Sequence, residues 1–195
     1  YDLHPRLKAT GDLAAAVADT DLLVLGVPTG AFRETCEVIA PVLRPWVPVV
    51  SLAKGFEPET RLRMTQIVEE VLPGRPVGVL SGPNLAKEIL AGNPAGAVVA
   101  LSEQHIAARL QEVFSTPMFR VFSHHDVVGC ELGGALKNVY AIAAGAVAGV
   151  VPGMSVGDLD GRYFDDAAYA ISAVAAATYT VTATGDNSTA PSAAD

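Results

Sequence analysis

The chain has 195 residues, of which 50% are hydrophobic and 17% are charged, and its formal net charge is −8. This is the composition of a globular protein, and its length is enough for one domain with a real core, or for one domain and part of another. The 13 basic residues are scattered, so the charge argues against a nucleic-acid or anionic-membrane surface.

The two cysteines and the N-terminal residues bear on the compartment. Cys36 and Cys130 stand in apolar helical contexts without metal-ligand spacing, and we interpret them as free thiols in a reducing cytoplasm rather than as a disulfide. The first ten residues, YDLHPRLKAT, lack both the apolar stretch of a secretory signal and an initiating Met. We therefore expect the chain to begin within a longer protein. The longest apolar run, 139–154, is too short for a membrane span.

From residue 11 onward, short apolar runs alternate with amphipathic stretches. The apolar runs are too short for helices, which predicts strands, and the first is expected to be buried on both faces. The predicted strands are 21–27, 47–53, 76–82, 95–101 and 118–124. The predicted helices are 31–43, 58–72, 84–91 and 103–114, the second with Pro58 at its start. This alternation indicates an α/β fold with a mostly parallel sheet wrapped by helices.

After Asp126 the pattern changes to a long helix, so we expect a domain boundary near 123–127. The predicted organisation is a sheet domain over 1–122, the start of a helical domain over 123–158, and a divergent tail over 159–195. The tail is rich in Ala and Thr, and its last ten residues have the polar composition of disordered segments.

Three predicted strands end in segments that can bind a ligand, because ligands of open α/β sheets bind at the carboxyl ends of strands. These segments are GVPTGAF, SLAKG and SGPNLAKE. Lys54 comes after an apolar strand and before Gly55, which directs its side chain toward the ligand edge. In SGPN, Gly82 allows close approach of the backbone, and Pro83 can open a helix whose first amides would offer an anion or amide site. Each segment alone can also be an ordinary turn.

Other candidate sites are weaker. No glycine-rich dinucleotide fingerprint occurs in the chain, since GCELGGALKN lacks the strand–loop–helix setting. His124 and His125 are adjacent and are not expected to share a face, while Ser51 and Ser81 lack a suitably placed His. The segment 158–166, DLDGRYFDD, is similar to the start of a calcium loop but lacks a ligand and the closing Glu, so we expect no calcium or other metal to bind.

Lys137 lies in an otherwise small and apolar stretch, ELGGALKNVYAIAAGAVAGV. On a helix its neighbours three and four residues away include no carboxylate. These neighbours are Gly133, Gly134, Tyr140 and Ala141. We expect a buried lysine without a charged partner, with a pKa lowered by burial from ~10.4 toward neutrality. The alternative is a lysine that extends its ammonium to solvent from a helix end.

Three segments in this order and spacing, VPVVSLAKG, VLSGPNLAKEI and DVVGCELGGALKNVYAIAAG, carry a family resemblance. Over residues 2–158 the chain resembles the NAD(P)-dependent glycerol-3-phosphate dehydrogenases, especially the bacterial type. The resemblance implies the C-terminal half of a Rossmann-type doubly wound parallel sheet, followed by the start of an all-helical domain. It also implies NAD or NADP as cofactor and interconversion of sn-glycerol 3-phosphate and dihydroxyacetone phosphate, which supplies glycerol 3-phosphate for glycerophospholipid synthesis.

The same resemblance implies roles for individual residues. Lys137 matches the catalytic lysine, whose ammonium would stabilise charge on the ketone oxygen and donate the proton. Lys54 matches a lysine that contacts both substrate and cofactor. The other substrate contacts implied are Gly82, Asn84 and Asn138. The other cofactor contacts implied are Phe32 and Ala86.

The chain also departs from the family pattern at both ends. In the family, the first strands carry a glycine-rich loop for the cofactor pyrophosphate, and these strands would lie before Tyr1. At the other end, the helical continuation expected after GMSVGD at 153–158 does not appear. The family's phosphate-binding arginine and its catalytic aspartate have no counterpart either. We therefore expect an incomplete dehydrogenase that is inactive by itself.

The expected partners and the alternatives follow from this interpretation. We expect the protein to bind a small-molecule substrate and no nucleic acid, and to have no membrane span. The resemblance also implies a cytoplasmic protein, with a homodimer possible for the full-length family. One alternative is another Rossmann-plus-helical dehydrogenase that acts on a sugar acid. The other is a non-catalytic, truncated product that only associates with other proteins.

Overall fold

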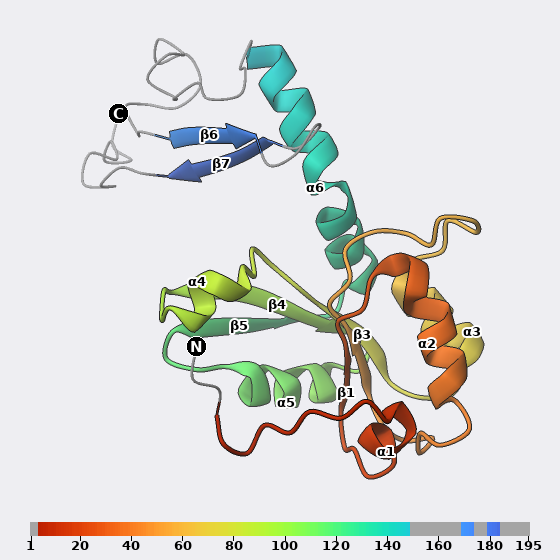
Figure 1. The fold of residues 1–195 in the computed structure, drawn as a ribbon. Helices are drawn as coiled ribbons and strands as arrows, with labels where there is room; N and C mark the ends of the chain where they lie inside the picture. Colours follow the sequence, from red (N-terminus) through yellow and green to blue (C-terminus); the bar gives the residue numbers. More distant parts are fainter. Residues whose placement is uncertain (1–3, 149–168, 174–178, 184–195) are drawn as a thin grey trace. The chain divides into compact units, whose positions relative to one another are not determined.

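A computed structural model describes residues 4–148, 169–173 and 179–183 of the chain. The chain divides into two compact units, Tyr1–Ala135 and Leu136–Asp195. The first unit contains a five-stranded sheet in the order β1-β2-β3-β4-β5 (Figure 1). Its strands are β1 (Leu23–Leu25), β2 (Val49–Ser51), β3 (Val77–Ser81), β4 (Ala95–Leu101) and β5 (Phe119–His124). All five strands predicted from the apolar runs are present.

The helices lie between these strands, as the alternating pattern predicts. They are α1 (Leu13–Val17), α2 (Phe32–Ile39), which follows the 3-10 turn η1 (Thr29–Ala31), α3 (Met64–Val71), α4 (Ala86–Leu90), α5 (Gln104–Phe114) and α6 (Val127–Ala148). The long helix α6 begins near the predicted domain boundary, but its first nine residues belong to the first unit.

The sheet is mostly parallel, which confirms the predicted α/β class. β1 pairs with β2, β2 with β3, and β4 with β5 in parallel, whereas β3 and β4 pair antiparallel. The carboxyl ends of β1, β2 and β3 therefore lie at one edge of the sheet, where the predicted ligand-binding segments begin.

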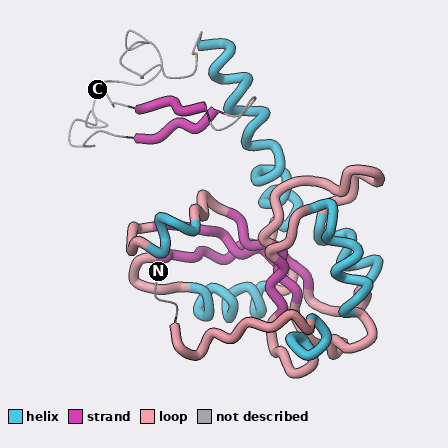
Figure 2. Tube along the Cα trace, viewed as in Figure 1, coloured by secondary structure: helices cyan, strands magenta, loops and turns pink. Residues whose placement is uncertain are grey.

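Two apolar cores lie on opposite faces of the sheet. Successive residues of a strand point to opposite faces, so Val49 packs into one core and Val50 into the other, and both are completely buried. The first core contains residues of α1, α2 and α3, and the second contains residues of α5. The separate placement of α5 and of the α2–α3 pair is visible in Figure 2. Helices on both faces give the doubly wound arrangement that the sequence predicts.

β1 is less buried than its apolar sequence predicts. Leu25 lies in the first core, but Val24 points to the other face and is 39% exposed. The reason is that β1 is an edge strand of the described sheet, and α5 packs on β4 and β5. The prediction that this strand is buried on both faces is therefore wrong for Val24.

The helix α3 begins later than predicted, at Met64 instead of Pro58. The residues before it form a tight loop, closed by a β-bridge between Phe56 and Arg63. Within this loop Arg61 adopts a positive φ of 63°, and Glu57 N–H donates a hydrogen bond to Leu62 O at 2.9 Å. These contacts compete with helical geometry, so the amphipathic pattern alone places the helix start too early.

The second unit contains the remainder of α6 and an antiparallel pair of strands, β6 (Tyr169–Ala173) and β7 (Tyr179–Ala183). These strands lie in the predicted C-terminal tail, most of which falls outside the described residues. The calcium-like segment 158–166 falls outside them as well. Among the helices that the structure describes, none combines the length and apolar character needed to cross a membrane.

Candidate active site

The turn after β2 brings the three predicted ligand-binding segments together. Its shape depends on Ser51, whose Oγ accepts a hydrogen bond from Ala53 N–H at 3.2 Å, and on Gly55, whose φ of 149° disfavours other residues. A β-carbon built on Gly55 would lie 3.2 Å from Thr29 Cγ2, in the segment after β1. Backbone pairing of Leu52 N–H with Leu25 O continues the parallel ladder into this turn.

Lys54 connects this turn to the segment after β3. Its Nζ donates a hydrogen bond to the carbonyl oxygen of Gly82 at 2.6 Å, although the two residues are 28 positions apart in the sequence. The side chain is exposed. The structure thus brings together Lys54 and Gly82, which the sequence predicts as substrate-binding residues, and places the lysine cation at the carboxyl edge of the sheet.

Asn84 lies beside Gly82 and carries a buried acceptor. Its Oδ1 atom is buried and has no hydrogen-bond partner among the described residues. A β-carbon built on Gly82 would lie 3.1 Å from this atom and 2.6 Å from Gly96 O, so only glycine fits here. A buried acceptor without a donor costs free energy, which makes Asn84 Oδ1 a natural place for an N–H or O–H group of a ligand.

α6 approaches the same edge through Gly134. A β-carbon built on Gly134 would lie 2.9 Å from Ser81 Oγ and 3.5 Å from Lys54 Cγ. From the sequence, Gly134 is predicted only as a helical neighbour of Lys137, and nothing there indicates Ser81 as its contact. The strand residue Ser81 and the helix residue Gly134 are therefore additions to the candidate site.

Lys137 and Asn138 lie on α6 in the second unit. Lys137 is exposed, and its Nζ donates a hydrogen bond to Asn138 Oδ1 at 2.7 Å. The expectation that Lys137 is buried is therefore wrong, whereas the partner that the structure gives it is an uncharged amide and not a carboxylate. The two residues that the family resemblance implies as catalytic and substrate-binding nevertheless contact each other.

The two predicted cofactor contacts besides Lys54 differ in their surroundings. Phe32 is completely buried in the first core, and its N–H donates to Thr29 O, so its visible role is packing. Ala86 is exposed at the start of α4. This helix begins at Ala86 and has five residues, so the prediction that Pro83 opens it is wrong, and the anion or amide site at its first turn stays a prediction. Both cofactor contacts stay predictions.

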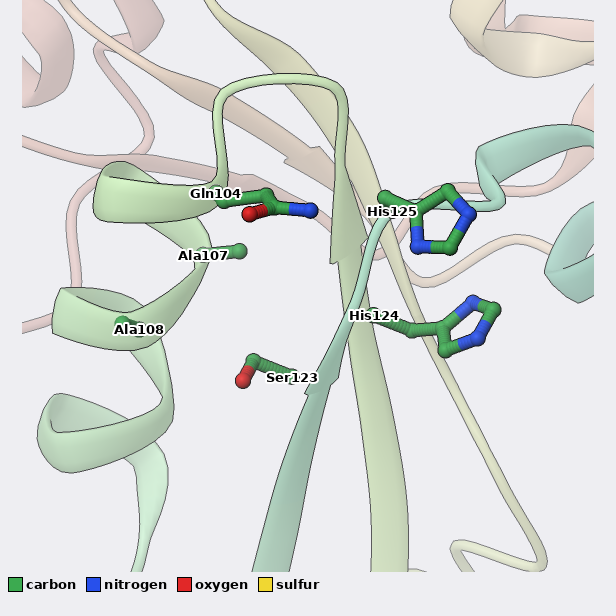
Figure 3. A pocket seen from close by; sticks show the side chains of 6 residues that line it. All are labelled: Gln104, Ala107, Ala108, Ser123, His124 and His125. Carbon is green, nitrogen blue, oxygen red and sulfur yellow. The ribbon is translucent and has the colours of Figure 1, made fainter.

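His124 and His125 line a cleft of about 290 Å³ between α5 and the end of β5 (Figure 3). Their rings stack at a centroid distance of 4.7 Å because the chain turns after β5, contrary to the expectation that adjacent residues cannot share a face. Both rings are exposed, and His124 Nδ1 accepts a hydrogen bond from Asp126 N–H. Among the described residues, no three His, Cys, Asp or Glu side chains gather in a way that could hold a metal ion.

Several groups of the first unit have shifted pKa values. Hydrogen bonds from Arg33 and then Thr60 lower the pKa of Glu57 to about 2, and the same pairing raises the pKa of Arg33. Both cysteines are free thiols. Burial raises the pKa of Cys36 to about 11 and also raises the pKa of Cys130. Burial lowers the pKa of Arg75. None of these groups belongs to the candidate site.

The fold and the candidate site define an α/β protein of the Rossmann type, with a lysine and an amide side chain at the carboxyl edge of its sheet. Sequence comparison gives the family. The profile of the NAD-dependent glycerol-3-phosphate dehydrogenase N-terminus matches residues 1–107, and that of the C-terminus of the same family matches residues 126–159. The chain belongs to this family.

Individual relatives agree with this assignment. The chain is 54% identical to glycerol-3-phosphate dehydrogenase [NAD(P)+] of Mycobacterium avium over 143 residues, which are 73% of this chain and 42% of that protein. Among solved structures, glycerol-3-phosphate dehydrogenase of Coxiella burnetii matches with a TM-score of 0.69 and 32% identity, over 76% of this chain and 46% of that one. The Saccharomyces cerevisiae enzyme matches with a TM-score of 0.67 and 30% identity, over 75% and 44%. The chain thus spans less than half the length of these relatives.

Proposed function

We propose that this chain forms part of an enzyme that interconverts sn-glycerol 3-phosphate and dihydroxyacetone phosphate with NAD(P)(H). The observation that carries the proposal is the contact between Lys54 Nζ and Gly82 O, with the buried acceptor of Asn84 beside it. It joins residues from two motifs of the family at one edge of the sheet.

The residues at this edge fit the reacting end of a nicotinamide cofactor and its substrate. Asn84 Oδ1 lacks a donor, and a substrate hydroxyl or a carboxamide N–H would supply one. The side chains that would hold the two molecules are Lys54 and Asn84, with Ala86 beside them on the cofactor side. When bound, the cofactor supplies or accepts a hydride.

The two lysines have different tasks in this proposal. Lys54 places a positive charge at the edge where a phosphorylated substrate would bind, and opposite charges attract. Lys137 donates a proton to the ketone oxygen as negative charge develops there, and in the reverse direction its neutral amine accepts the alcohol proton. The side-chain oxygen of Asn138, 2.7 Å from Lys137 Nζ, holds the ammonium in place.

The same proposal covers the cellular setting. The two free cysteines suit a reducing compartment, so we place the protein in the cytoplasm, where its product would serve glycerophospholipid synthesis. We also expect the full-length protein to be a homodimer that binds no nucleic acid, consistent with the net charge of −8.

A chimeric enzyme tests the proposed function. The matching segment of the Mycobacterium avium relative would be replaced by the 143 residues of this chain that align with it. We expect the chimera to reduce dihydroxyacetone phosphate with NADH or NADPH. Lys137→Ala should lower kcat by ~10²–10⁴-fold, because general acid–base catalysis contributes about that much. Lys54→Ala should mainly raise the KM for dihydroxyacetone phosphate.

The control is Arg109→Ala, which removes an exposed basic side chain of α5 outside the candidate site and should leave both constants unchanged. A folded chimera that does not reduce dihydroxyacetone phosphate would refute the proposal. Reduction or oxidation of a sugar acid by that chimera would favour the alternative dehydrogenase. A Lys137→Ala variant with kcat within a few-fold of the unmutated chimera would remove the catalytic role of this lysine.

A further inference from the structure

Glu131 is a buried carboxylate that the proposed chemistry does not use. It lies in the first turns of α6, is 8% exposed, and accepts hydrogen bonds from three donors. Its Oε1 accepts from Thr65 N–H at 3.0 Å, and its Oε2 accepts from the Thr65 hydroxyl and from Arg63 Nη1, both at 2.6 Å. The Thr65 hydroxyl in turn accepts from Arg63 Nη1 at 3.0 Å. The carboxylate, the hydroxyl and the guanidinium thus form one closed network.

The network joins α6 to the N-terminus of α3. Arg63 is the N-cap of α3, and Thr65 is the second residue of the helix. The first amides of a helix have no partner within it and carry partial positive charge, so a carboxylate is favoured there. Glu131 therefore caps α3 from another helix. Its negative charge is compensated by Arg63, whose Nη1 lies 2.6 Å from Glu131 Oε2.

The contact between Glu131 and α3 holds the first turns of α6 close to Ser81 and Lys54 of the candidate site. Gly134 follows Glu131 by three residues, nearly one helical turn, and approaches Ser81 and Lys54 so closely that a β-carbon at Gly134 would overlap Ser81 Oγ. We propose that Glu131 is a positioning residue: its bonds to Arg63 and Thr65 dock the first turns of α6 against α3 and so fix the packing of Gly134 around Lys54. This inference rests on the proposed function, in which Lys54 contacts substrate and cofactor.

A small displacement of α6 should be enough to impair the site. Misplacement of a reacting group by about 1 Å can cost ~10²-fold in rate. Glu131→Gln keeps the size of the side chain and an acceptor for Thr65 N–H, but it removes the charge that Arg63 and the α3 N-terminus bind. We therefore expect loosened docking without loss of the fold.

Docking can be measured in this chain by the alkylation of its two thiols. Cys130 precedes Glu131 on α6 and is partly buried, whereas Cys36 is completely buried in the first core and reports global unfolding. The thiols are alkylated with iodoacetamide, and the modified residues are identified by mass spectrometry. Glu131→Gln should accelerate modification of Cys130 by about tenfold or more, which corresponds to a free energy of local opening of α6 that is lower by about 1.4 kcal/mol. Cys36 should stay unmodified. Glu112→Gln is the matched control, because it breaks an exposed ion pair with Arg109 on α5.

Positioning itself is measured in the chimera. Glu131→Gln should raise the KM for dihydroxyacetone phosphate by about 10–100-fold, in the same direction as Lys54→Ala, because a displaced Lys54 binds the substrate less well. Simple loss of folded enzyme would instead lower the apparent kcat and leave this KM unchanged. Thr65→Val, which removes only the hydroxyl, should give a smaller effect in the same direction, and it replaces Glu131→Gln if that variant does not fold.

The outcomes separate this inference from the proposed function. An unchanged Cys130 rate, equal acceleration at both thiols, or an unchanged KM for dihydroxyacetone phosphate overturns the positioning role. If the unmutated chimera does not reduce dihydroxyacetone phosphate, the proposed function is refuted and the positioning role with it, whereas the Cys130 rates still show whether Glu131 docks α6.

Discussion

The carboxylate of Glu57, in the loop before α3, is held by partners that compensate its charge. Arg33 donates two hydrogen bonds to it, at 2.7 and 2.9 Å, and the Thr60 hydroxyl donates another. Arg33 also pairs with Glu70 on α3 at 2.9 Å. A residue from α2 therefore ties the loop before α3 to α3 itself.

The Glu57 network predicts a pH dependence of stability. The pKa of Glu57 falls from its ordinary 4.5 to about 2 in the folded chain. A lowered folded pKa gives stability that is complete above the unfolded pKa and disappears as the pH falls through the folded one. The melting temperature of the unmutated chain should therefore exceed that of Glu57→Gln at pH ~7, and the gap should close between about pH 4.5 and pH 2.

Differential scanning calorimetry of both chains across this pH range is the measurement. Glu112→Gln, in an exposed ion pair, is the control and should show a small gap at every pH. A gap between the unmutated chain and Glu57→Gln that stays constant down to pH ~2 would show that the ionised form of Glu57 does not stabilise the fold.

At the scale of elements, close backbone contact between β3 and β4 constrains which residue can stand at position 78. The strands pair antiparallel, with Gly78 opposite Leu101. A β-carbon built on Gly78 would lie 2.2 Å from Ala100 O and 2.4 Å from Leu101 Cγ. The backbone oxygen cannot move away without disturbing the ladder, so this position in the middle of the sheet requires glycine.

We predict that Gly78→Ala destabilises the first unit by about 1–3 kcal/mol, the usual cost of overpacking a core. The matched control is Gly96→Ala in β4, where the nearest atom to a new β-carbon is Arg120 O at 3.7 Å, an ordinary contact. Urea unfolding followed by circular dichroism gives both changes in the free energy of unfolding. Equal stability of the two variants would contradict the overlap at Gly78.

At the scale of the whole molecule, local patterns in the sequence predict the strands and most helices. They do not predict features that depend on contacts between residues far apart in the sequence. The parallel strands and their ends could be predicted because buried apolar runs such as 47–53 are short and are followed by turn residues. The roles of Glu131 and Ser81 could not. Glu131 finds its partners 66 and 68 positions earlier in the sequence, and no local periodicity indicates such a pair.

The exposure of Lys137 was missed for a related reason. An apolar stretch predicts burial only if another element packs on it, and in the described residues Val139 and Tyr140 of the same helix are exposed too. The family resemblance gave Lys137 and Lys54 their roles. The structure adds the contacts of Lys54 with Gly82 and of Lys137 with Asn138.

We predict that the purified 195-residue polypeptide does not bind NADH at micromolar concentrations. A dinucleotide needs amides of a glycine-rich loop at a helix N-terminus for its pyrophosphate, and the 195 residues contain no G-x-G-x-x-G. Lys54 and Asn84 would contact only the reacting end of the cofactor. Binding a ligand costs translational and rotational entropy whether few or many contacts form. Contacts to the reacting end alone are too few to offset this cost, so the affinity for NADH should be weak.

Isothermal titration calorimetry of the polypeptide with NADH is the measurement, and the chimera with the Mycobacterium avium enzyme is the positive control. The chimera should bind NADH because its remaining residues come from a complete relative. Saturable micromolar binding by the polypeptide alone, weakened by Lys54→Ala, would show that the edge formed by Lys54, Gly82 and Asn84 holds the cofactor without a phosphate loop. In that case the sheet edge, and not the pyrophosphate contact, would supply the main binding free energy.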